Sequence, residues 1–183
     1  MSASIELILY ACPTGELAVL LQQYFEASAR ACGANAAHAF PPHCTLTGFF
    51  HDQRRAVSFY AGALQRAVEQ ATSSQDRIGL RITSLYLMES FHFILLRSDG
   101  IKSLVRSFAR TAMSPTRTEP LRTKEWLHLS LAYGFSPDHR GTLRRIAREH
   151  FGSIGSIPVS WEIVLYERAG SGRWIRHAVW SLS

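Results

Sequence analysis

Long hydrophobic runs are missing from this sequence of 183 residues. No apolar stretch approaches the ~20 residues that a membrane-spanning helix requires. The short apolar run from Ile5 to Ala11 lacks the basic start and the length of a secretory signal. Cysteine is also scarce, with three residues in no metal-like spacing. We therefore expect a cytoplasmic protein without a disulfide framework.

The common motifs for metal and phosphate binding are absent from the sequence as well. It contains no His-Glu-x-x-His pattern, no paired-carboxylate cluster and no Gly-rich phosphate loop. We therefore expect neither a metal site nor a cofactor. The sequence does have 46% hydrophobic residues and a formal net charge of +6, from 20 Lys and Arg against 14 Asp and Glu. That excess suits an anionic partner such as a nucleotide or an RNA end, although a moderately basic protein is often simply soluble.

The length of residues 1–183 fits one compact domain, or two small lobes that share a core, and is too short for two full domains with a linker. Apolar periodicity predicts four helices, over residues 17–32, 57–71, 101–112 and 137–151. Strand patterns cover residues 5–11, 43–50, 78–82, 91–96, 126–133, 157–168 and 173–182. Strands that follow one another without an intervening helix argue against a parallel doubly wound sheet, so the expected class is α+β with mainly antiparallel pairing.

Three local features refine these expectations. Thr14 and Gly33 are placed to begin and end the first helix, and Asp52 is placed to cap the second. The nearly continuous apolar run over residues 91–96 is typical of a strand in the centre of a sheet.

Two strand segments carry the same short pattern. His43-Cys44-Thr45-Leu46 and His128-Leu129-Ser130-Leu131 both read histidine, apolar residue, hydroxyl residue, leucine. Because side chains alternate along a strand, each histidine shares a face with the hydroxyl two residues later. A single strand histidine is more often structural than catalytic. The signal is the duplication, since both copies lie in a strand that precedes a helix.

Two imidazoles and two hydroxyls that face one another suit the cleavage of a phosphoester without a metal. One neutral histidine takes a proton from the attacking water, and the other, protonated, gives a proton to the departing oxygen. The hydroxyls donate hydrogen bonds to the non-bridging phosphate oxygens. The expected catalytic residues are therefore His43, Thr45, His128 and Ser130.

The duplicated pattern resembles the 2H phosphoesterase superfamily, and the match narrows to the 2H domain of the TULA/STS family, the suppressors of T-cell receptor signalling. The resemblance runs from about residue 5 to about residue 180. The residues that carry it are Tyr10, Pro13-Thr14-Gly15, Leu17, Cys32-Gly33, Asn35, His38, Phe40, Pro42-His43, Thr45-Leu46, Phe49-Phe50, Leu127 to Tyr133 and Phe135.

This resemblance implies a two-lobed, pseudo-twofold α+β fold, in which antiparallel sheets line a central cleft and helices lie outside. It also implies metal-independent hydrolysis of cyclic or 2′-linked nucleotide phosphodiesters. Ser130 stands where the family usually has threonine. The hydroxyl is kept, but the methyl group that stiffens its rotamer is lost.

Residues near the first motif are candidates for substrate contact. Thr47 and Phe49 share the strand parity of His43, so that the Phe49 ring is placed to stack on a base. A core position for Phe49 fits the pattern equally well. His38, just upstream, is a further candidate, for which a loop-stabilising role fits at least as well.

Residues near the second motif are also candidates. Lys124 precedes the motif in a basic loop with Arg117 and Arg122, and lysine and arginine bind phosphate, although such loops are more often solvated surface. Tyr133 has the opposite parity to His128 unless the strand bends, and the family resemblance keeps it as a possible contact.

The leading hypothesis is a hydrolase that opens a 2′,3′-cyclic phosphate on a nucleotide or an RNA end, with the two histidines dividing the acid and base roles. Hydrolysis of a 2′,5′ or 3′,5′ linkage is a close variant. A non-catalytic module that binds nucleotides or RNA ends is the alternative from another class. The sequence assigns neither the base among the two histidines nor the product isomer, the base preference or the oligomeric state.

Overall fold

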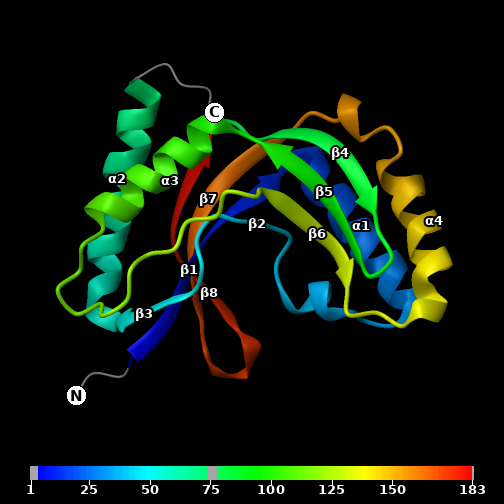
Figure 1. The fold of residues 1–183 in the computed structure, drawn as a ribbon, viewed down its shortest axis with the longest axis horizontal. Helices are drawn as coiled ribbons and strands as arrows, with labels where there is room; N and C mark the ends of the chain where they lie inside the picture. Colours follow the sequence, from blue (N-terminus) through cyan, green and yellow to red (C-terminus); the bar gives the residue numbers. More distant parts are fainter. Residues whose placement is uncertain (1–3, 74–77, 183) are drawn as a thin grey trace.

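The computed structural model describes residues 4–73 and 78–182, which form four α-helices and one eight-stranded sheet (Figure 1). The helices are α1 (Gly15–Cys32), α2 (Val57–Ser73), α3 (Asp99–Thr111) and α4 (Arg140–Phe151). The strands are β1 (Ser4–Thr14), β2 (Cys44–Thr45), β3 (Phe50–Gln53), β4 (Arg81–Leu87), β5 (Phe91–Arg97), β6 (His128–Tyr133), β7 (Ser160–Arg168) and β8 (Trp174–Leu182). The predicted α+β class is confirmed.

The sheet is antiparallel throughout, in the order β4-β5-β6-β2-β1-β7-β8, and β3 also pairs with β1. Strand β2 joins the two halves of the sheet: its Thr45 pairs with Tyr10 of β1, and its Cys44 pairs with Leu129 of β6. The first motif therefore lies where these two halves of the sheet meet. Strand β5, expected at the centre, is second from the edge, because only β4 lies outside it.

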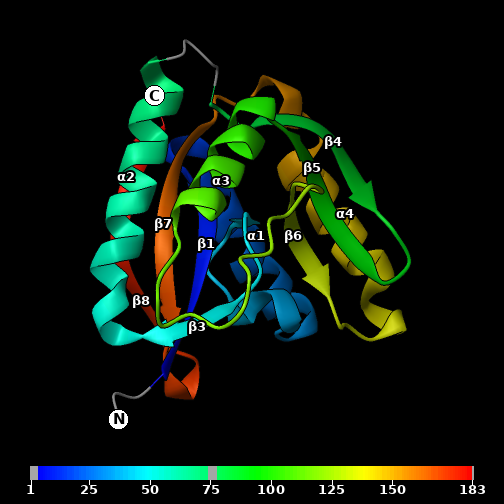
Figure 2. The ribbon, with the colours of Figure 1, turned by 60° about the vertical axis from the view of Figure 1, so that its left-hand side comes forward.

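The helices lie outside the sheet in two pairs (Figures 1 and 2). Helices α2 and α3 pack together near β7 and β8, and helices α1 and α4 pack together behind β5 and β6. Helix α1 ends at Gly33, whose φ of 76° favours glycine, as the sequence predicts. Within residues 4–73 and 78–182, no helix has both the length and the apolar character needed to cross a membrane.

The continuous strand predicted over residues 43–50 is wrong, because the ladder breaks after two residues. The amide groups of Leu46 and Thr47 both bind the carbonyl oxygen of Leu9, at 3.0 and 3.4 Å, and regular pairing resumes only at β3. The segment between β2 and β3 is therefore irregular, and part of it lies beside the cavity described below.

The predicted capping role of Asp52 is also wrong. Helix α2 begins at Val57, after a 3₁₀ turn over Arg54–Ala56. The buried Asp52 carboxylate instead accepts hydrogen bonds from the Tyr60 hydroxyl at 2.6 Å and from Thr116 Oγ1 at 2.5 Å. It thereby ties the loop between α3 and β6 to helix α2.

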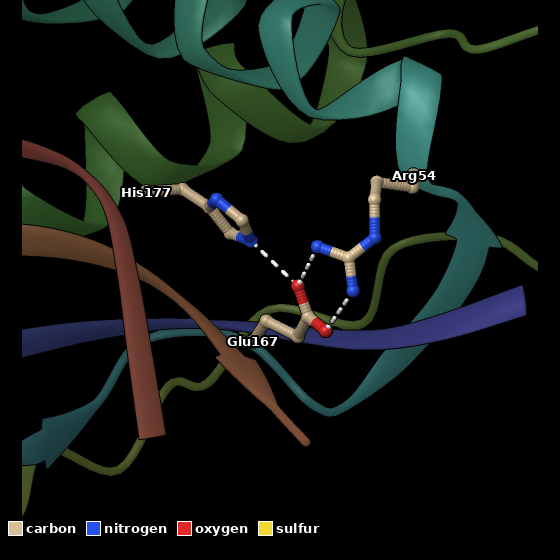
Figure 3. A network of polar contacts seen from close by, with 3 residues as sticks. All are labelled: Arg54, Glu167 and His177. Atoms are coloured by element: carbon tan, nitrogen blue, oxygen red, sulfur yellow. Dashed lines mark hydrogen bonds and ion pairs between the residues drawn. The ribbon is translucent and has the colours of Figure 1, made fainter. Parts of the chain in front are cut away.

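A second polar network joins strands β7 and β8 to the turn before α2 (Figure 3). Glu167, only 3% exposed, accepts two hydrogen bonds from the Arg54 guanidinium, at 2.6 and 3.0 Å, and lies 2.8 Å from His177 Nε2. Burial alone would raise the pKa of Glu167, but the hydrogen bonds from Arg54 and His177 hold this pKa below its usual value. The carboxylate is thus buried as an ion with its partners in place.

Candidate active site

The residues of the two motifs meet on one face of the sheet, where β2 pairs with β6. Cys44 pairs with Leu129 in antiparallel register, so each histidine lies across from the hydroxyl residue of the other motif. Cys44 and Leu129 themselves have no exposed surface and point to the opposite face. The pairing brings together His43, Thr45, His128 and Ser130.

His43 is held in one orientation by its neighbours. Its Nδ1 donates a hydrogen bond to the Pro41 carbonyl oxygen at 2.7 Å, so in the neutral ring Nε2 carries the lone pair. Thr45 Oγ1 lies 3.1 Å from Nε2, and the Tyr10 ring stacks on the imidazole with centroids 3.7 Å apart. Burial lowers the pKa of His43 to about 4, against the effect of the Pro41 hydrogen bond. At neutral pH the side chain is therefore an uncharged base.

His128 has an aromatic neighbour of the same kind. The Trp126 indole stacks on the imidazole with centroids 4.0 Å apart and planes 29° apart. Nδ1 is buried with no hydrogen bond of normal geometry to any described residue, although the Trp126 carbonyl lies close enough to favour the protonated ring. Burial, with a smaller contribution from Lys124, lowers the pKa of His128. A bound anion beside the ring would oppose this shift.

Both histidines line one cavity of about 650 Å³, within the ~300–1,000 Å³ usual for small-molecule sites. The two rings are close enough for the charge of His128 to lower the pKa of His43. Besides the four motif residues, the wall is largely apolar and aromatic, with two basic side chains; these further residues are Ile8, Tyr10, Phe25, Ala37, Phe40, Pro41, Pro42, Thr47, Gly48, Phe49, Phe91, Arg122, Lys124 and Tyr133.

Three of the residues predicted to contact substrate lie in the cavity wall, but their side chains have different surroundings. Phe49 lines it and carries the Arg168 guanidinium over its ring, at 4.3 Å from the centroid. Lys124 lines it from the exposed loop before β6. Thr47 also borders it, but the residue is fully buried and its hydroxyl accepts a hydrogen bond from the Leu9 amide at 3.0 Å. Thr47 thus fixes the wall to β1.

Tyr133 reaches the cavity because β6 contains a β-bulge. Between Ser130 and Ala132, β6 advances two residues while its partner β5 advances one, so Leu131 is extra. The extra residue shifts the alternation by one place, which turns Tyr133 to the same side as Ser130. A regular strand would have turned the Tyr133 side chain away from the cavity. Burial raises the pKa of the Tyr133 hydroxyl.

His38 and Arg117 lie outside the cavity wall. The Asn35 amide donates to His38 Nδ1 at 3.1 Å, and His38 Nε2 lies 3.1 Å from the Phe25 carbonyl oxygen, which closes the cap of a short 3₁₀ turn. The Arg117 guanidinium bonds to the carbonyl oxygen of Glu119 at 2.7 Å. Nδ1 is thus engaged within the loop and Nε2 by helix α1, so the His38 ring fixes this loop to α1, and a contact of His38 with substrate stays a prediction.

The aromatic side chains beside the histidines were missed by the motif analysis. Trp126 stands two residues before His128, just as Pro41 stands two residues before His43, so strand alternation alone would have placed it on the face of the imidazole. Trp174 of β8 donates to the carbonyl oxygen of Ala39 at 3.1 Å and was not signalled by any motif.

Within residues 4–73 and 78–182, no group of three or more His, Cys, Asp and Glu residues is placed to hold a metal ion.

The chain is similar over most of its length to curated proteins. It is 31% identical over 166 residues to the ubiquitin-associated and SH3 domain-containing protein B of Mus musculus. This match covers 89% of this chain and 25% of that protein. It is 27% identical over 181 residues to the ecdysteroid-phosphate phosphatase of Bombyx mori, covering 97% of this chain and 26% of that protein. The chain thus spans about a quarter of the length of these relatives.

The comparison with solved structures gives a more distant likeness. The crystal structure of E. coli LigT complexed with 3′-AMP covers 99% of this chain and 99% of that chain, with a TM-score of 0.49 and 14% sequence identity. No protein-family model matches the chain.

Proposed function

We propose a function on the basis of family membership. The chain belongs to the 2H phosphoesterase superfamily, as does the segment that it matches in the ubiquitin-associated and SH3 domain-containing proteins. We infer that residues 1–183 act as one cytoplasmic domain that hydrolyses 2′,3′-cyclic phosphates on nucleotides or RNA ends without a metal. The observation that carries this proposal is the pairing of β2 with β6, which lines one cavity with two imidazoles and two hydroxyls.

His43 acts as the general base in this proposal. Its pKa of about 4 leaves the ring neutral at pH 7, and the hydrogen bond from Nδ1 to Pro41 leaves the lone pair on Nε2. Nε2 takes a proton from a water molecule, whose oxygen then bonds to phosphorus. Thr45 Oγ1, at 3.1 Å from Nε2, is within reach of the same phosphate.

His128 acts as the general acid. The nearby Trp126 carbonyl opposes the effect of burial on the pKa of His128 and so favours the imidazolium form. A phosphate anion between the two rings raises the pKa of His128 further. As the bond from phosphorus to O2′ or O3′ breaks, the leaving oxygen takes a proton from His128, and the product is a nucleoside monophosphate.

The remaining polar groups of the cavity stabilise the charge that develops on the phosphate. The hydroxyls of Thr45 and Ser130 donate to the non-bridging oxygens, and Lys124 and Arg122 supply positive charge from the rim. The aromatic wall offers faces on which the nucleobase stacks. Hydrolysis of a 2′,5′-linked diester uses the same groups and stays a variant of the proposal.

The test is an assay with the four 2′,3′-cyclic nucleotides and a 2′,5′-linked dinucleotide in excess EDTA, followed by chromatography of the products. We expect a nucleoside monophosphate from at least one cyclic nucleotide. Product that forms only after Mg²⁺ or Mn²⁺ is supplied would contradict the metal-independent mechanism. Binding of every substrate without turnover of any would favour the non-catalytic module instead.

A further inference from the structure

The half of the sheet formed by β4, β5 and β6 exposes aromatic side chains beyond the cavity. Strand alternation divides β5 into two faces: Phe91, which lines the cavity, shares one face with Phe93, and the fully buried Ile94 lies on the other face. On the face of Phe93, Tyr86 of β4 is 42% exposed, and Trp126, just before β6, is 52% exposed. Large aromatic rings with this exposure are surfaces available for contact.

These rings form a continuous series of contacts that ends on a candidate catalytic residue. Tyr86 stacks on Phe93, directly opposite it in the sheet, with centroids 5.0 Å apart and planes 13° apart. Trp126 meets the edge of Phe93 with centroids 5.1 Å apart, and Trp126 in turn stacks on His128. The buried Phe93 ring thus contacts both exposed rings, Tyr86 and Trp126. The contacting rings extend from the edge strand β4 into the cavity.

Positive charge lies at both ends of this aromatic face. Lys124 and Arg122 are exposed at the cavity, and Arg97 is exposed at the end of β5, on the same face as Phe91 and Phe93 by strand alternation. The acidic side chain next to Trp126, Glu125, is neutralised by ion pairs with Arg106 at 3.2 Å and Lys102 at 3.8 Å. The acidic side chain of Glu89, in the turn between β4 and β5, is paired with two arginines of α4.

We propose that this face binds the nucleotides next to the reacting phosphate of a single-stranded oligonucleotide, with Trp126 and Tyr86 as successive stacking platforms. Exposed aromatic rings beside cations are the features by which proteins hold single strands without reading their sequence. The face is continuous with the cavity, so one strand can occupy both. This inference rests on the proposed function and names its substrate class as oligonucleotide ends rather than free mononucleotides.

The test is a binding measurement that needs no turnover. The probe is hexaadenylate with a 3′-phosphate and a 5′ fluorescent label, followed by anisotropy, and 3′-AMP is measured by competition. We expect the hexamer to bind at least tenfold more tightly than 3′-AMP. Tyr86→Ala should weaken the hexamer about tenfold more than it weakens 3′-AMP, and Tyr86→Phe should restore the affinity. Phe59→Ala, a 37% exposed aromatic position on α2, is the matched control and should change neither affinity.

Equal affinities for the hexamer and 3′-AMP would overturn the inference and leave the proposed hydrolase intact. An equal effect of Tyr86→Ala and Phe59→Ala on the hexamer would overturn it as well. A shift from dimer to monomer on Tyr86→Ala, measured by sedimentation, would show that the face pairs with a second copy of this chain and would also overturn it. Conversely, Tyr86-dependent hexamer binding in a protein that turns over no diester would contradict the proposed function alone.

Discussion

At the scale of single residues, the two histidines have similar chemistry but different surroundings. His43 is fixed by a carbonyl acceptor and a stacked tyrosine, and its pKa falls to about 4. His128 contacts a half-exposed tryptophan and faces Lys124, and its pKa is lowered as well. Both shifts follow mainly from burial of the charged form in the cavity. They determine the pH range in which one ring is neutral while the other is protonated.

The pH dependence of kcat/KM follows from these shifts. Activity requires neutral His43, so it should rise as the pH increases through about 4, and it requires protonated His128, so it should fall above the lowered pKa of that ring. We expect a bell-shaped profile with its maximum between about pH 4 and the ordinary histidine value of ~6.5. Initial rates over pH 3.5–9 on one cyclic nucleotide check this, and a rate that still increases above pH 7 contradicts the assigned roles.

The hydroxyl of Ser130 should matter more than the methyl group that threonine would add. Ser130→Ala removes a hydrogen-bond donor to the phosphate and should lower kcat by about 10²-fold, as for other lost oxyanion donors. Ser130→Thr keeps the donor and should retain activity. Ser136→Ala, at an exposed position whose side chain caps no helix, is the control. Full activity in Ser130→Ala would remove this hydroxyl from the mechanism.

At the scale of secondary-structure elements, the site depends on two irregular segments. The bulge at Leu131 turns Tyr133 into the cavity, and the loop between α3 and β6 carries Lys124 and Arg122 to its rim. That loop is fixed at Asp52 through Thr116, and the Gly48 and Lys124 amides pair it with the segment after β2. The loop belongs to neither motif, and the second motif includes Leu131 without signalling its bulge, yet both segments determine which groups face the cavity.

Asp52→Asn should loosen this loop. The Asp52 carboxylate accepts hydrogen bonds from the Tyr60 and Thr116 hydroxyls and from the backbone amide of Gln53. In the asparagine variant the side-chain NH₂ would face one of these donors, and that hydrogen bond would be lost. We expect the free energy of unfolding to fall by about 1–3 kcal/mol, and KM for a cyclic nucleotide to rise more than kcat changes. Urea unfolding and steady-state kinetics measure both effects, with the exposed Asp138→Asn as control. An unchanged urea midpoint would show that Asp52 does not hold the loop.

Regular elements were the part of this fold that the sequence could predict. Helix α1 follows from apolar spacing between Thr14 and Gly33, and the β7–β8 hairpin follows from two alternating segments around a Gly-rich turn. The broken strand after Thr45 and the bulge at Leu131 could not be predicted, because both depend on partners distant in the sequence. Trp126 lies two residues before His128, so strand alternation predicts that the two side chains share a face, but no motif residue signals the stack.

At the scale of the whole molecule, stability should decrease in acid because neutral histidines are buried. His92 is fully buried, and neither ring nitrogen has a hydrogen bond of normal geometry to a described residue. Burial, and then the charge of Arg144, lowers the pKa of His92 to about 4. The unfolded chain binds a proton at ~6.5 and the folded chain only near 4, so stability is lost as the pH falls through this window.

His92→Leu should remove part of this loss. Wild type should lose up to about 3 kcal/mol through His92 between pH 7 and pH 4, in addition to a loss of the same sign through His43. The variant should therefore show a shallower pH dependence, and the exposed His51→Gln should match wild type. Urea unfolding at pH 7 and pH 4.5 compares them. Parallel curves for wild type and His92→Leu would contradict this assignment.

The most direct test of the two-histidine mechanism is kcat/KM on one 2′,3′-cyclic nucleotide for His43→Ala, His128→Ala and the double variant, with folding checked by circular dichroism. If the two rings act on one phosphate, each single variant should lose at least about 10³-fold, and the double variant should lose little more than either, because groups that act as a unit are not additive. A single variant with wild-type activity, or losses that multiply in the double variant, would contradict the account.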